Sequence, residues 1–472
     1  MRVAIHRIVI DGLNLGLKRG TGIASYSDTL SRLLQQLQYR VDVLYDRPVN
    51  RGPDALKQEI SFYADPPHGK TGPRGLRRAR RLLDRLGRAV PAGIAAVRGM
   101  RAADVRTDVV LPGDALPHHP AGAGILAAAG VFRNASATAT LLRRPLRVRL
   151  PEGAALHLTC PIPLVAEGAP TIMTVHDIIP LRMPYAVVDP RFRFLQHLRI
   201  MVERADHIIA VSESTKRDLL QVMGHLRPEK ISVAYQPVRP PRAFDAGMAA
   251  RLVEELYGLT PGGYFLFAGA IEPKKNLPRL IEAFLVSSAS VPLVIVGPNG
   301  WMVKEQLAPL ARHRARQKNG PGYGRADEKI LVLGYVPGFH LTALLSQARA
   351  LLFPSIYEGF GLPMVEAMQL GVPVLTGSLG SLPEVAGGAA LLADPFDAMA
   401  IARGIRRLDA DGDLRDALRE AGLRNAARFS EGNCLSMLES AYRAAGIAGT
   451  QRASADDEMA TGGAMAAGGE TA

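Results

Sequence analysis

Short apolar runs separated by amphipathic stretches repeat along most of the 472-residue chain. Each run in the first half ends in polar residues, as strands buried between helices do. The predicted strands of this half are 3–10, 41–45, 155–158, 171–175 and 207–211, with a helix over 25–37 after the first. This alternation predicts an α/β fold built on a parallel sheet.

The alternation becomes more regular after the proline-rich segment 237–241, which we interpret as an interdomain linker. The predicted strands there are 264–268, 292–296, 330–333 and 350–353, with helices over 277–285 and 340–348. Such an order predicts a doubly wound parallel sheet. The chain also exceeds the roughly 250–300 residues that one core supports. We therefore expect two Rossmann-like domains, 1–240 and 241–446, with the last helix a candidate for packing back on the first domain.

Two segments depart from this pattern. Residues 66–150 are expected to form an insertion, because 70–106 is rich in arginine and 121–140 is rich in alanine and glycine. Residues 447–472 are expected to form a disordered tail, because large apolar side chains are nearly absent from them.

The composition is that of an ordinary globular protein, with 47% hydrophobic and 21% charged residues. Cys160 and Cys434 match no metal or redox spacing, which favours buried packing residues in a reducing compartment. The first residues are too polar for a signal peptide, and no 18-residue window is uninterruptedly apolar. We expect a cytoplasmic protein.

A formal net charge of +13 implies attraction to an anionic partner. Within 70–106, arginines and leucines alternate at helical spacing, which predicts a basic amphipathic helix that can lie on an anionic membrane face. A solvated helix or loop explains the same pattern equally well. The arginines concerned are Arg74, Arg77, Arg78, Arg80, Arg81, Arg85 and Arg88. Aromatic residues make up only 6% of the chain and none interrupts this basic run, which argues against a nucleic-acid partner.

The stretch 357–368, YEGFGLPMVEAM, carries the strongest chemical signal. Its glycines predict a loop with accessible backbone amides, and Pro363 suits the first turn of a following helix. A loop of this kind and a helix N-terminus attract phosphate. Glu366 lies one turn inside that helix, where a second anion is unfavourable, so its carboxylate suits neutral hydroxyls instead. The candidate ligand-binding residues are Glu358, Gly359, Phe360, Gly361, Leu362 and Glu366.

The two glutamates seven residues apart, with the flanking FPSIYEGFGLP, EAMQLGVPV and GSLPEVAGGAALLADP, resemble the paired-glutamate motif of family 4 glycosyltransferases. The resemblance implies the GT-B fold, in which two Rossmann-like domains face a central cleft. It also implies that Glu366 holds the ribose hydroxyls of a nucleotide-sugar donor and that Glu358 reaches the transferred sugar.

A second match to this family is FAGAIEPKKNLPRLIEAF at 267–284. It places Lys274 and Lys275 after a strand, at the sheet edge where α/β proteins bind ligands. We expect Lys275, helped by Lys274, to neutralise the donor diphosphate. Many relatives have an arginine where this chain has Ala270, so the lysines are the main cations expected here.

The first half contributes weaker signals. Gly20 and Gly22 resemble the family's loop that closes over the diphosphate, although such a turn is more often only a tight bend. In TIMTVHDIIPLRMP, His176 follows a strand, and the family pattern places this histidine against the donor sugar. Ser212 in VSESTKRDLL is predicted to be a helix N-cap.

No metal ion or other cofactor is expected. Asp409 and Asp411 have the D-x-D spacing of a metal-binding class of glycosyltransferases, but their charged amphipathic surroundings favour turn and helix-cap roles. No histidine and cysteine cluster suggests zinc. A pyridoxal-phosphate phosphorylase is disfavoured because no lysine stands in a suitable setting.

The resemblance implies a retaining glycosyltransferase that moves a hexose from a nucleotide-diphosphate sugar to a saccharide or lipid-linked saccharide acceptor. Mannose from GDP-mannose is the first expectation, in cell-surface polysaccharide synthesis at the inner face of the plasma membrane. The alternatives are a sugar-nucleotide epimerase or hydrolase on the same fold and, more remotely, a basic nucleic-acid-binding protein.

Overall fold

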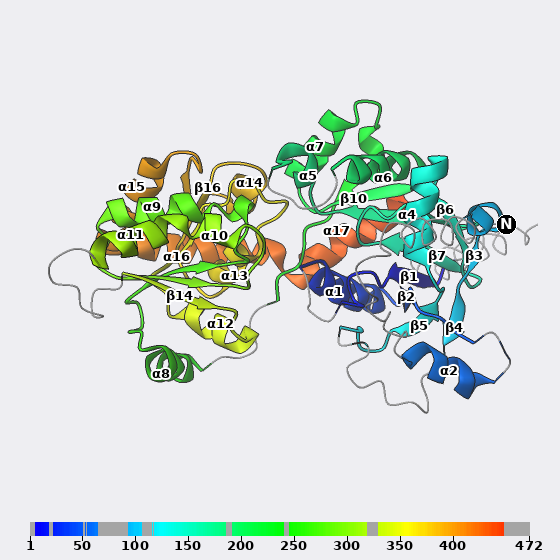
Figure 1. Ribbon diagram of the computed structural model, residues 1–472, viewed down its shortest axis with the longest axis horizontal. Coiled ribbons are helices and arrows are strands. Elements are labelled where there is room, and N and C mark those ends of the chain that lie inside the picture. Colours follow the sequence, from blue (N-terminus) through cyan, green and yellow to red (C-terminus); the bar gives the residue numbers. More distant parts are fainter. Residues whose placement is uncertain are drawn as a thin grey trace, which may run out of the picture.

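The computed structural model describes residues 5–17, 22–50, 52, 54–64, 93–105, 116, 118–185, 191–239, 245–318 and 329–447. Two α/β domains lie side by side along the long axis of the molecule (Figure 1). The chain passes from the first domain to the second and returns to the first in its final helix.

The N-terminal domain holds an eight-stranded sheet in the order β11-β10-β9-β7-β1-β2-β5-β4. Its described pairs are parallel, except that β4 runs antiparallel to β5 at the edge. The strands are β1 (Arg7–Asp11), β2 (Arg40–Tyr45), β4 (Ala103–Val105), β5 (Gly124–Ala127), β7 (Ala154–Leu158), β9 (Thr171–Val175), β10 (His207–Ala210) and β11 (Ile231–Val233). Strands β3 (Met100–Arg101), β6 (Leu146–Arg149) and β8 (Leu164–Ala166) form a small second sheet.

The helices of this domain cover both faces of its main sheet (Figure 1). They are α1 (Gly22–Gln36), α2 (Ala55–Tyr63), α4 (Val131–Leu142), α5 (Ile179–Arg182), α6 (Arg191–Arg204) and α7 (Glu213–Val222). Ser212 caps α7, since its side chain accepts a hydrogen bond from the Thr215 amide. The N-cap prediction for this residue is confirmed.

The C-terminal domain holds a six-stranded parallel sheet in the order β14-β13-β12-β15-β16-β17, the doubly wound arrangement predicted. The strands are β12 (Phe265–Ala268), β13 (Leu293–Val296), β14 (Ile330–Gly334), β15 (Ala350–Phe353), β16 (Val374–Gly377) and β17 (Leu391–Ala393). The helices are α8 (Ala246–Tyr257), α9 (Leu277–Ser287), α10 (Val303–Gln306), α11 (Ala308–Lys318), α12 (Gly338–Ser346), α13 (Leu362–Gln369), α14 (Leu382–Ala386), α15 (Ala398–Ala410), α16 (Gly412–Ala426) and α17 (Glu431–Ala444).

Each main sheet has an apolar core on both faces. Successive side chains of a strand point to opposite faces, so Ile8 and Val9 of β1 enter different hydrophobic clusters, as do Phe265 and Leu266 of β12. Burial on both sides explains why these strands read as continuous apolar runs, and each buried side chain contributes about 1.5–3 kcal/mol.

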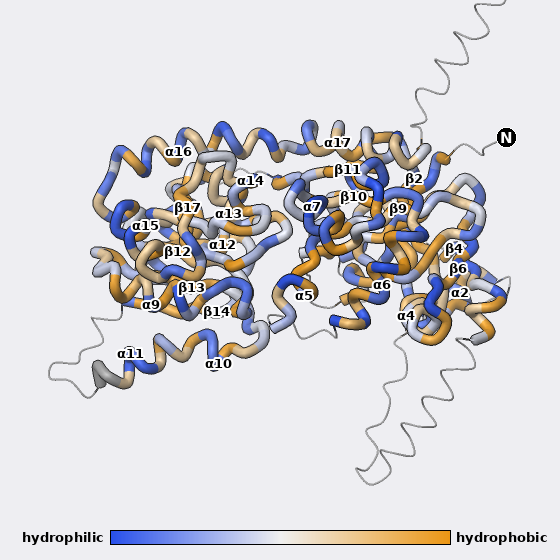
Figure 2. The backbone as a smooth tube through the Cα atoms, turned by 90° about the horizontal axis from the view of Figure 1, so that it is seen from above, coloured by the Kyte–Doolittle hydropathy of each residue, from blue (hydrophilic) through white to orange (hydrophobic). Residues whose placement is uncertain are grey.

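Helix α17 joins the two domains. Figure 2 shows α16 beside the C-terminal sheet and α17 continuing along the same side to the N-terminal domain. There Leu438 and Ala441 enter the core beneath β1 and β2. The buried hydroxyl of Tyr442 lies 2.6 Å from Nδ1 of His157 on β7. The end of the chain's second half is therefore part of the first domain's core.

The predicted insertion at 66–150 is wrong over its second part. The Ala/Gly-rich stretch 121–140 contains β5, which pairs with β2 in the main sheet, and α4. The small side chains of this stretch allow close packing, and Ala135 and Ala139 on α4 are fully buried.

The prediction of a disordered tail over 447–472 is wrong at its first residue, Ile447. This side chain is buried after a left-handed turn at Gly446.

Other predictions fall beyond the described residues. Most of the arginine-rich segment lies in 65–92, and 448–472 lies outside the description as well. Cys434 is buried and Cys160 is partly buried, and both are free thiols. No helix in the described part of the chain is long and apolar enough to cross a membrane.

Replacing Tyr442 by Phe tests how α17 is anchored. The change removes the hydroxyl that meets His157 and leaves a buried imidazole nitrogen without its partner, so we expect a loss of about 1 kcal/mol in the free energy of unfolding. Urea denaturation monitors the change. Ser436→Ala, at an exposed position of the same helix, serves as the control. Equal stabilities of the Tyr442 variant and the wild type would contradict the anchoring role.

Candidate active site

The predicted site residues gather where the carboxyl ends of the two parallel sheets face each other. His176 and Asp177 directly follow β9, Lys274 and Lys275 lie in a short 3-10 turn after β12, and Glu358 follows β15. Parallel strands end at a common edge, and α/β proteins place their ligands there. The arrangement brings residues more than 180 positions apart in the chain into one site.

The two domains meet at Gly359 without room for a side chain. A methyl group built on Gly359 would lie 2.0 Å from the carbonyl oxygen of His176 and 2.9 Å from Cβ of Asp177. The Thr215 hydroxyl of α7 also donates to the His176 carbonyl, at 3.1 Å. The glycine is therefore required by the close approach of the two loops.

Lys275 and Glu358 form a buried ion pair. Nζ of Lys275 lies 2.7 Å from Oε1 of Glu358, and it also sits over the Phe353 ring, 4.6 Å from its centre. Lys274 lies between two carboxylates, 3.4 Å from Glu272 and 3.7 Å from Glu358. The sequence assigned the lysines to one group of the ligand and Glu358 to another, whereas here they contact each other directly.

The charges of this cluster depend on one another. Burial by itself would raise the pKa of the Glu358 carboxyl, but Lys275 and Lys274 outweigh burial and lower it. Burial would lower the pKa of Lys274, yet Glu358, Asp177 and Glu272 raise it. Burial raises the pKa of Asp177, and Lys274 only partly opposes this. The shifts of Lys274 and Glu358 both favour the charged forms of these two residues. Removing one partner of this cluster would leave a buried charge uncompensated.

The N-terminus of α13 is open. Gly361 is its N-cap, with φ 101° and ψ 47°, and no side chain of the described residues caps the first turn. The left-handed conformation suits glycine, so the loop can turn here without strain. Pro363 has no amide hydrogen and the Met364 amide donates to the Gly361 carbonyl, so among the first three residues of α13 the Leu362 amide is the one that can receive an anion. Leu362 begins the helix, half-buried, while the Phe360 side chain is buried against Tyr235 and Phe429. Only the backbone of Phe360 can therefore belong to a ligand site.

Glu366 is the fifth of the eight residues of α13, and it is exposed to solvent. Protein atoms around its carboxyl limit hydration and raise its pKa. Among the described residues, no hydrogen bond or ion pair engages it. An unpaired carboxylate close to a free helix N-terminus fits a ligand with an anionic part and neutral hydroxyls.

His176 is partly buried, and both of its ring nitrogens contact protein groups. Nε2 lies 3.0 Å from the carbonyl of Thr159, and Nδ1 lies 2.7 Å from Nε2 of Gln236. The Tyr26 ring meets the imidazole edge-on at 4.7 Å between centres. Burial lowers the pKa of His176 to about 4, so the ring is neutral near pH 7.

Sequence reasoning missed the contacts that hold the domains together. The Glu384 carboxylate of α14 accepts hydrogen bonds from the amides of Glu213 and Ser214, at 2.8 and 2.9 Å, and so caps α7 from the other domain. Tyr357 donates to Asp218, which also pairs with Arg182 at 2.5 Å. No local spacing signals the Glu384 and Tyr357 contacts, because their partners lie more than 130 positions apart.

Several residues that the sequence singled out do not contact this cluster or lie outside the described residues. Gly20 lies outside the described residues, and Gly22 is the first residue of α1. Asp411 caps α16, as predicted, while Asp409 bonds to Ser290 and pairs with Arg349. Within the described residues, no group of three or more His, Cys, Asp or Glu side chains is arranged for a metal ion.

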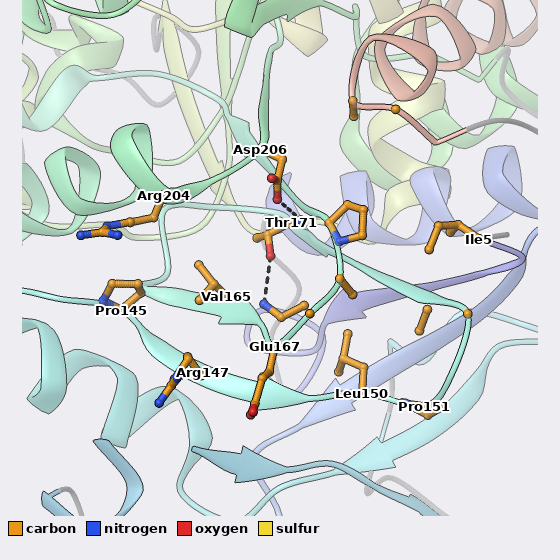
Figure 3. Close-up of a pocket in the computed structure, with 18 of the residues that line it drawn as sticks. Ile5, Pro145, Arg147, Leu150, Pro151, Val165, Glu167, Thr171, Arg204 and Asp206 are labelled. Carbon is orange, nitrogen blue, oxygen red and sulfur yellow. Dashed lines mark hydrogen bonds between the residues drawn. The ribbon is translucent and has the colours of Figure 1, made fainter. Parts of the chain in front are cut away.

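A cavity of about 1120 Å³ lies at the opposite end of the N-terminal sheet. Its lining includes Ile5, which precedes β1, and Ala154 and Thr171, which are the first residues of β7 and β9. Figure 3 shows Asp206 bonded to the backbone of Thr171 at this site. The cavity therefore faces away from His176 and Glu358, and it is distinct from the candidate active site.

Replacing Gly359 by Ala should push the two domains apart. The added methyl cannot fit beside the His176 carbonyl, so we expect a loss of about 1–3 kcal/mol in stability or an opened arrangement with a larger radius of gyration. Small-angle scattering and thermal denaturation measure the two outcomes. Gly338→Ala is the control, since a methyl there meets no atom within 4 Å. A variant at 359 with unchanged stability and dimensions would contradict the close contact.

Two family models match the chain. Residues 94–242 match Glycosyltransferase Family 4, and residues 260–425 match Glycosyl transferases group 1. These segments cover the N-terminal sheet from β4 onward and most of the C-terminal sheet with its glutamate loop. Both halves of the candidate active site fall within them.

Curated relatives and solved structures agree with these models. The O-antigen chain mannosyltransferase B of Escherichia coli is 31% identical over 283 residues, which cover 58% of this chain and 70% of the relative. The O-antigen chain mannosyltransferase RfbU of Salmonella typhimurium is 31% identical over 52% of this chain and 62% of its own length. The crystal structure of WaaG, a glycosyltransferase involved in lipopolysaccharide biosynthesis, superposes with a TM-score of 0.54 at 13% identity, over 92% of this chain and 98% of that structure. The chain therefore belongs to the family 4 glycosyltransferases and is a glycosyltransferase with the two-domain GT-B fold.

Proposed function

We propose that this enzyme transfers mannose from GDP-mannose to a saccharide or lipid-linked saccharide, with retention of configuration, in cell-surface polysaccharide synthesis. One observation supports the proposal most: Glu366 and the N-terminus of α13 have no side-chain partner among the described residues, and they directly follow the loop in which Glu358 pairs with Lys275 and Gly359 packs against His176. Such a site has separate places for a ribose, a diphosphate and a sugar. The choice of mannose rests on the names of the O-antigen relatives.

In this proposal the amides of Gly359 and Gly361, the α13 N-terminus and Lys275 receive the diphosphate. They stabilise the charge that develops on it as the glycosidic bond breaks, so the proposal includes no metal ion. Lys275 turns from Glu358 toward the diphosphate, and Glu358 is then free to accept hydrogen bonds from the sugar hydroxyls. Glu366 accepts hydrogen bonds from the two ribose hydroxyls.

We assign retention to attack of the acceptor on the same face of the sugar from which the diphosphate leaves. The departing phosphate assists by taking the acceptor proton. Gly20 and Gly22 are proposed to approach the diphosphate from the N-terminal domain, since Gly22 begins α1 after β1. His176 faces the donor sugar from the end of β9.

A membrane-bound acceptor and a cytoplasmic location at the inner face of the plasma membrane are part of this proposal. The helical turn 93–98 and the end of α4 lie together, since Arg144 donates to the carbonyl of Ala96 at 3.1 Å. They carry exposed apolar side chains beside exposed arginines, namely Ile94, Val97, Leu141 and Leu142 with Arg98, Arg143 and Arg144. Such a surface suits anionic lipid headgroups.

The first test measures GDP-mannose turnover with membrane fractions as the acceptor, in the wild type and in Glu366→Ala. Loss of two charged hydrogen bonds should lower kcat/KM by about 100-fold or more. Glu255→Ala, on the exposed face of α8, is the control. Near wild-type transfer by Glu366→Ala would sink the proposed donor site. Turnover of the donor without any acceptor would favour an epimerase or hydrolase instead.

The second test is sedimentation with liposomes. We expect the protein to bind phosphatidylglycerol vesicles more tightly than phosphatidylcholine vesicles, and salt to weaken the binding. Arg98→Glu combined with Arg143→Glu reverses two charges near the surface and should lower the binding at least about tenfold, because each cation contributes about 1 kcal/mol. Equal binding to both kinds of vesicle would contradict membrane contact.

A further inference from the structure

The hydrogen-bond partners of His176 determine its tautomer. A backbone carbonyl can only accept a hydrogen bond, so Nε2, which lies 3.0 Å from the Thr159 oxygen, carries the proton. Nδ1 of the neutral ring is then an acceptor, and it receives the Gln236 side-chain amide at 2.7 Å. Thr159 is itself held, because its amide and hydroxyl both donate to the buried carboxylate of Asp11.

Gln236 lies in the linker between the two sheets, three residues after β11, and is 7% exposed. Its neighbours bind alternately to the two domains, as in any extended segment. The Ala234 amide donates to Ala210 of β10, whereas the Tyr235 ring packs on Phe360 and Phe429 of the C-terminal domain. The Val238 amide donates to the Phe429 carbonyl. The linker is therefore fastened on both sides of Gln236, and this side chain is held against the histidine.

We propose that Gln236 is a positioning residue for His176: its amide donates to Nδ1 and holds the imidazole as the neutral, Nε2-protonated form. The inference rests on the proposed function, in which His176 faces the donor sugar. With the amide nitrogen of Gln236 turned toward the ring, a proton added to Nδ1 would point at an N–H group, so protonation would first require the amide to turn over and present its oxygen.

A neutral ring matters because of the charge that the reaction creates. As the diphosphate departs, the transferred sugar takes on oxocarbenium-like positive charge. An imidazolium beside it would repel that charge, whereas a neutral imidazole does not. Gln236 thus keeps a positive charge away from the place where the sugar must become positive.

Other titratable groups near His176 can also affect its protonation. Tyr26 of α1 meets the ring, and His157 of β7 lies behind it, joined to Tyr26 through the Thr174 hydroxyl. Asp11 stands behind Thr159, and Asp177 follows His176 in the chain. None of these side chains bonds to Nδ1, which leaves Gln236 as the residue in contact with that nitrogen in the described structure.

Two variants of the full chain separate a charge effect from a packing effect. Gln236→Glu keeps the shape but places a carboxylate at Nδ1, which accepts a proton from an imidazolium and so raises the pKa of His176. Gln236→Met keeps approximate size and removes the hydrogen bond without adding charge. Two readouts are used: ¹⁵N chemical shifts of the labelled histidines, assigned with a His176→Gln variant, and the pH dependence of kcat with GDP-mannose.

In the wild type we expect the neutral Nε2–H form between about pH 5.5 and 8.5. In Gln236→Glu, Nδ1 should be protonated at the acid end, and kcat should fall about tenfold or more at about pH 6 and recover partly as the pH rises. Gln236→Met removes the opposing donor without adding a charge, so burial should still keep the ring neutral near pH 7, while its protonation should begin at a higher pH than in the wild type and at a lower pH than in Gln236→Glu.

A neutral His176 and a wild-type pH profile in Gln236→Glu would overturn the inference. Equal, pH-independent losses in both variants would overturn it too, since packing alone would then explain them. A His176 titration in Gln236→Met identical to that of the wild type would also overturn the inference.

The two readouts also distinguish failure of this inference from failure of the proposed function. If the wild type does not turn over GDP-mannose, the proposed donor is wrong, and the ¹⁵N shifts still decide whether Gln236 controls the His176 tautomer. If turnover is normal while the shifts show an Nδ1–H form in the wild type, the inference about Gln236 alone is wrong.

Discussion

The backbone of Gly359 packs directly against the carbonyl of His176, and this contact sets the spacing between the carboxyl edges of the two sheets. Parallel strands bring their following loops to a common edge, so each domain presents its chemistry on one side only. Because the edges face each other, His176 from one domain and the lysines and glutamates from the other share a site. Glu384, which caps α7 across the boundary, stabilises the same arrangement.

Charge balance is the second constraint on this site. Lys275 and Glu358 are both less than a tenth exposed, so breaking their ion pair without a replacement would leave buried charge uncompensated. A diphosphate that enters must take over the role of Glu358 toward Lys275. The cluster thus suits a ligand with two parts. A negatively charged part would pair with Lys275, and hydroxyl groups would donate to Glu358 once it has left the ion pair. On the opposite side, His176 is partly buried, and the desolvation of its ring lowers its pKa to about 4, so it is neutral near pH 7.

The linker and α17 make the two domains dependent on each other. Gln236 and Tyr235, adjacent in the chain, contact opposite domains, and Tyr442 completes a buried polar series through His157 and Thr174 to Tyr26 beside His176. Buried polar groups that satisfy one another in this way favour one specific arrangement of their elements. The histidine is therefore oriented by residues from the linker and from the far end of the chain.

The sequence by itself determined the α/β alternation of both domains and the loop before α13, and it predicted Glu358, Glu366, Lys274 and Lys275 as donor-binding residues. These features follow from local patterns, such as apolar runs between helices, glycines before Pro363, and motifs confined to short stretches. Local composition gave a wrong prediction at 121–140. The alanines and glycines there pack closely in β5 and α4, but in the sequence they resemble an irregular insertion. Only the tertiary structure decided that Lys275 pairs with Glu358, that Glu384 caps α7 and that Gln236 contacts His176. Each of these contacts joins residues far apart in the chain, and the folding of two sheets against each other, rather than any spacing in the sequence, brings them within hydrogen-bond distance.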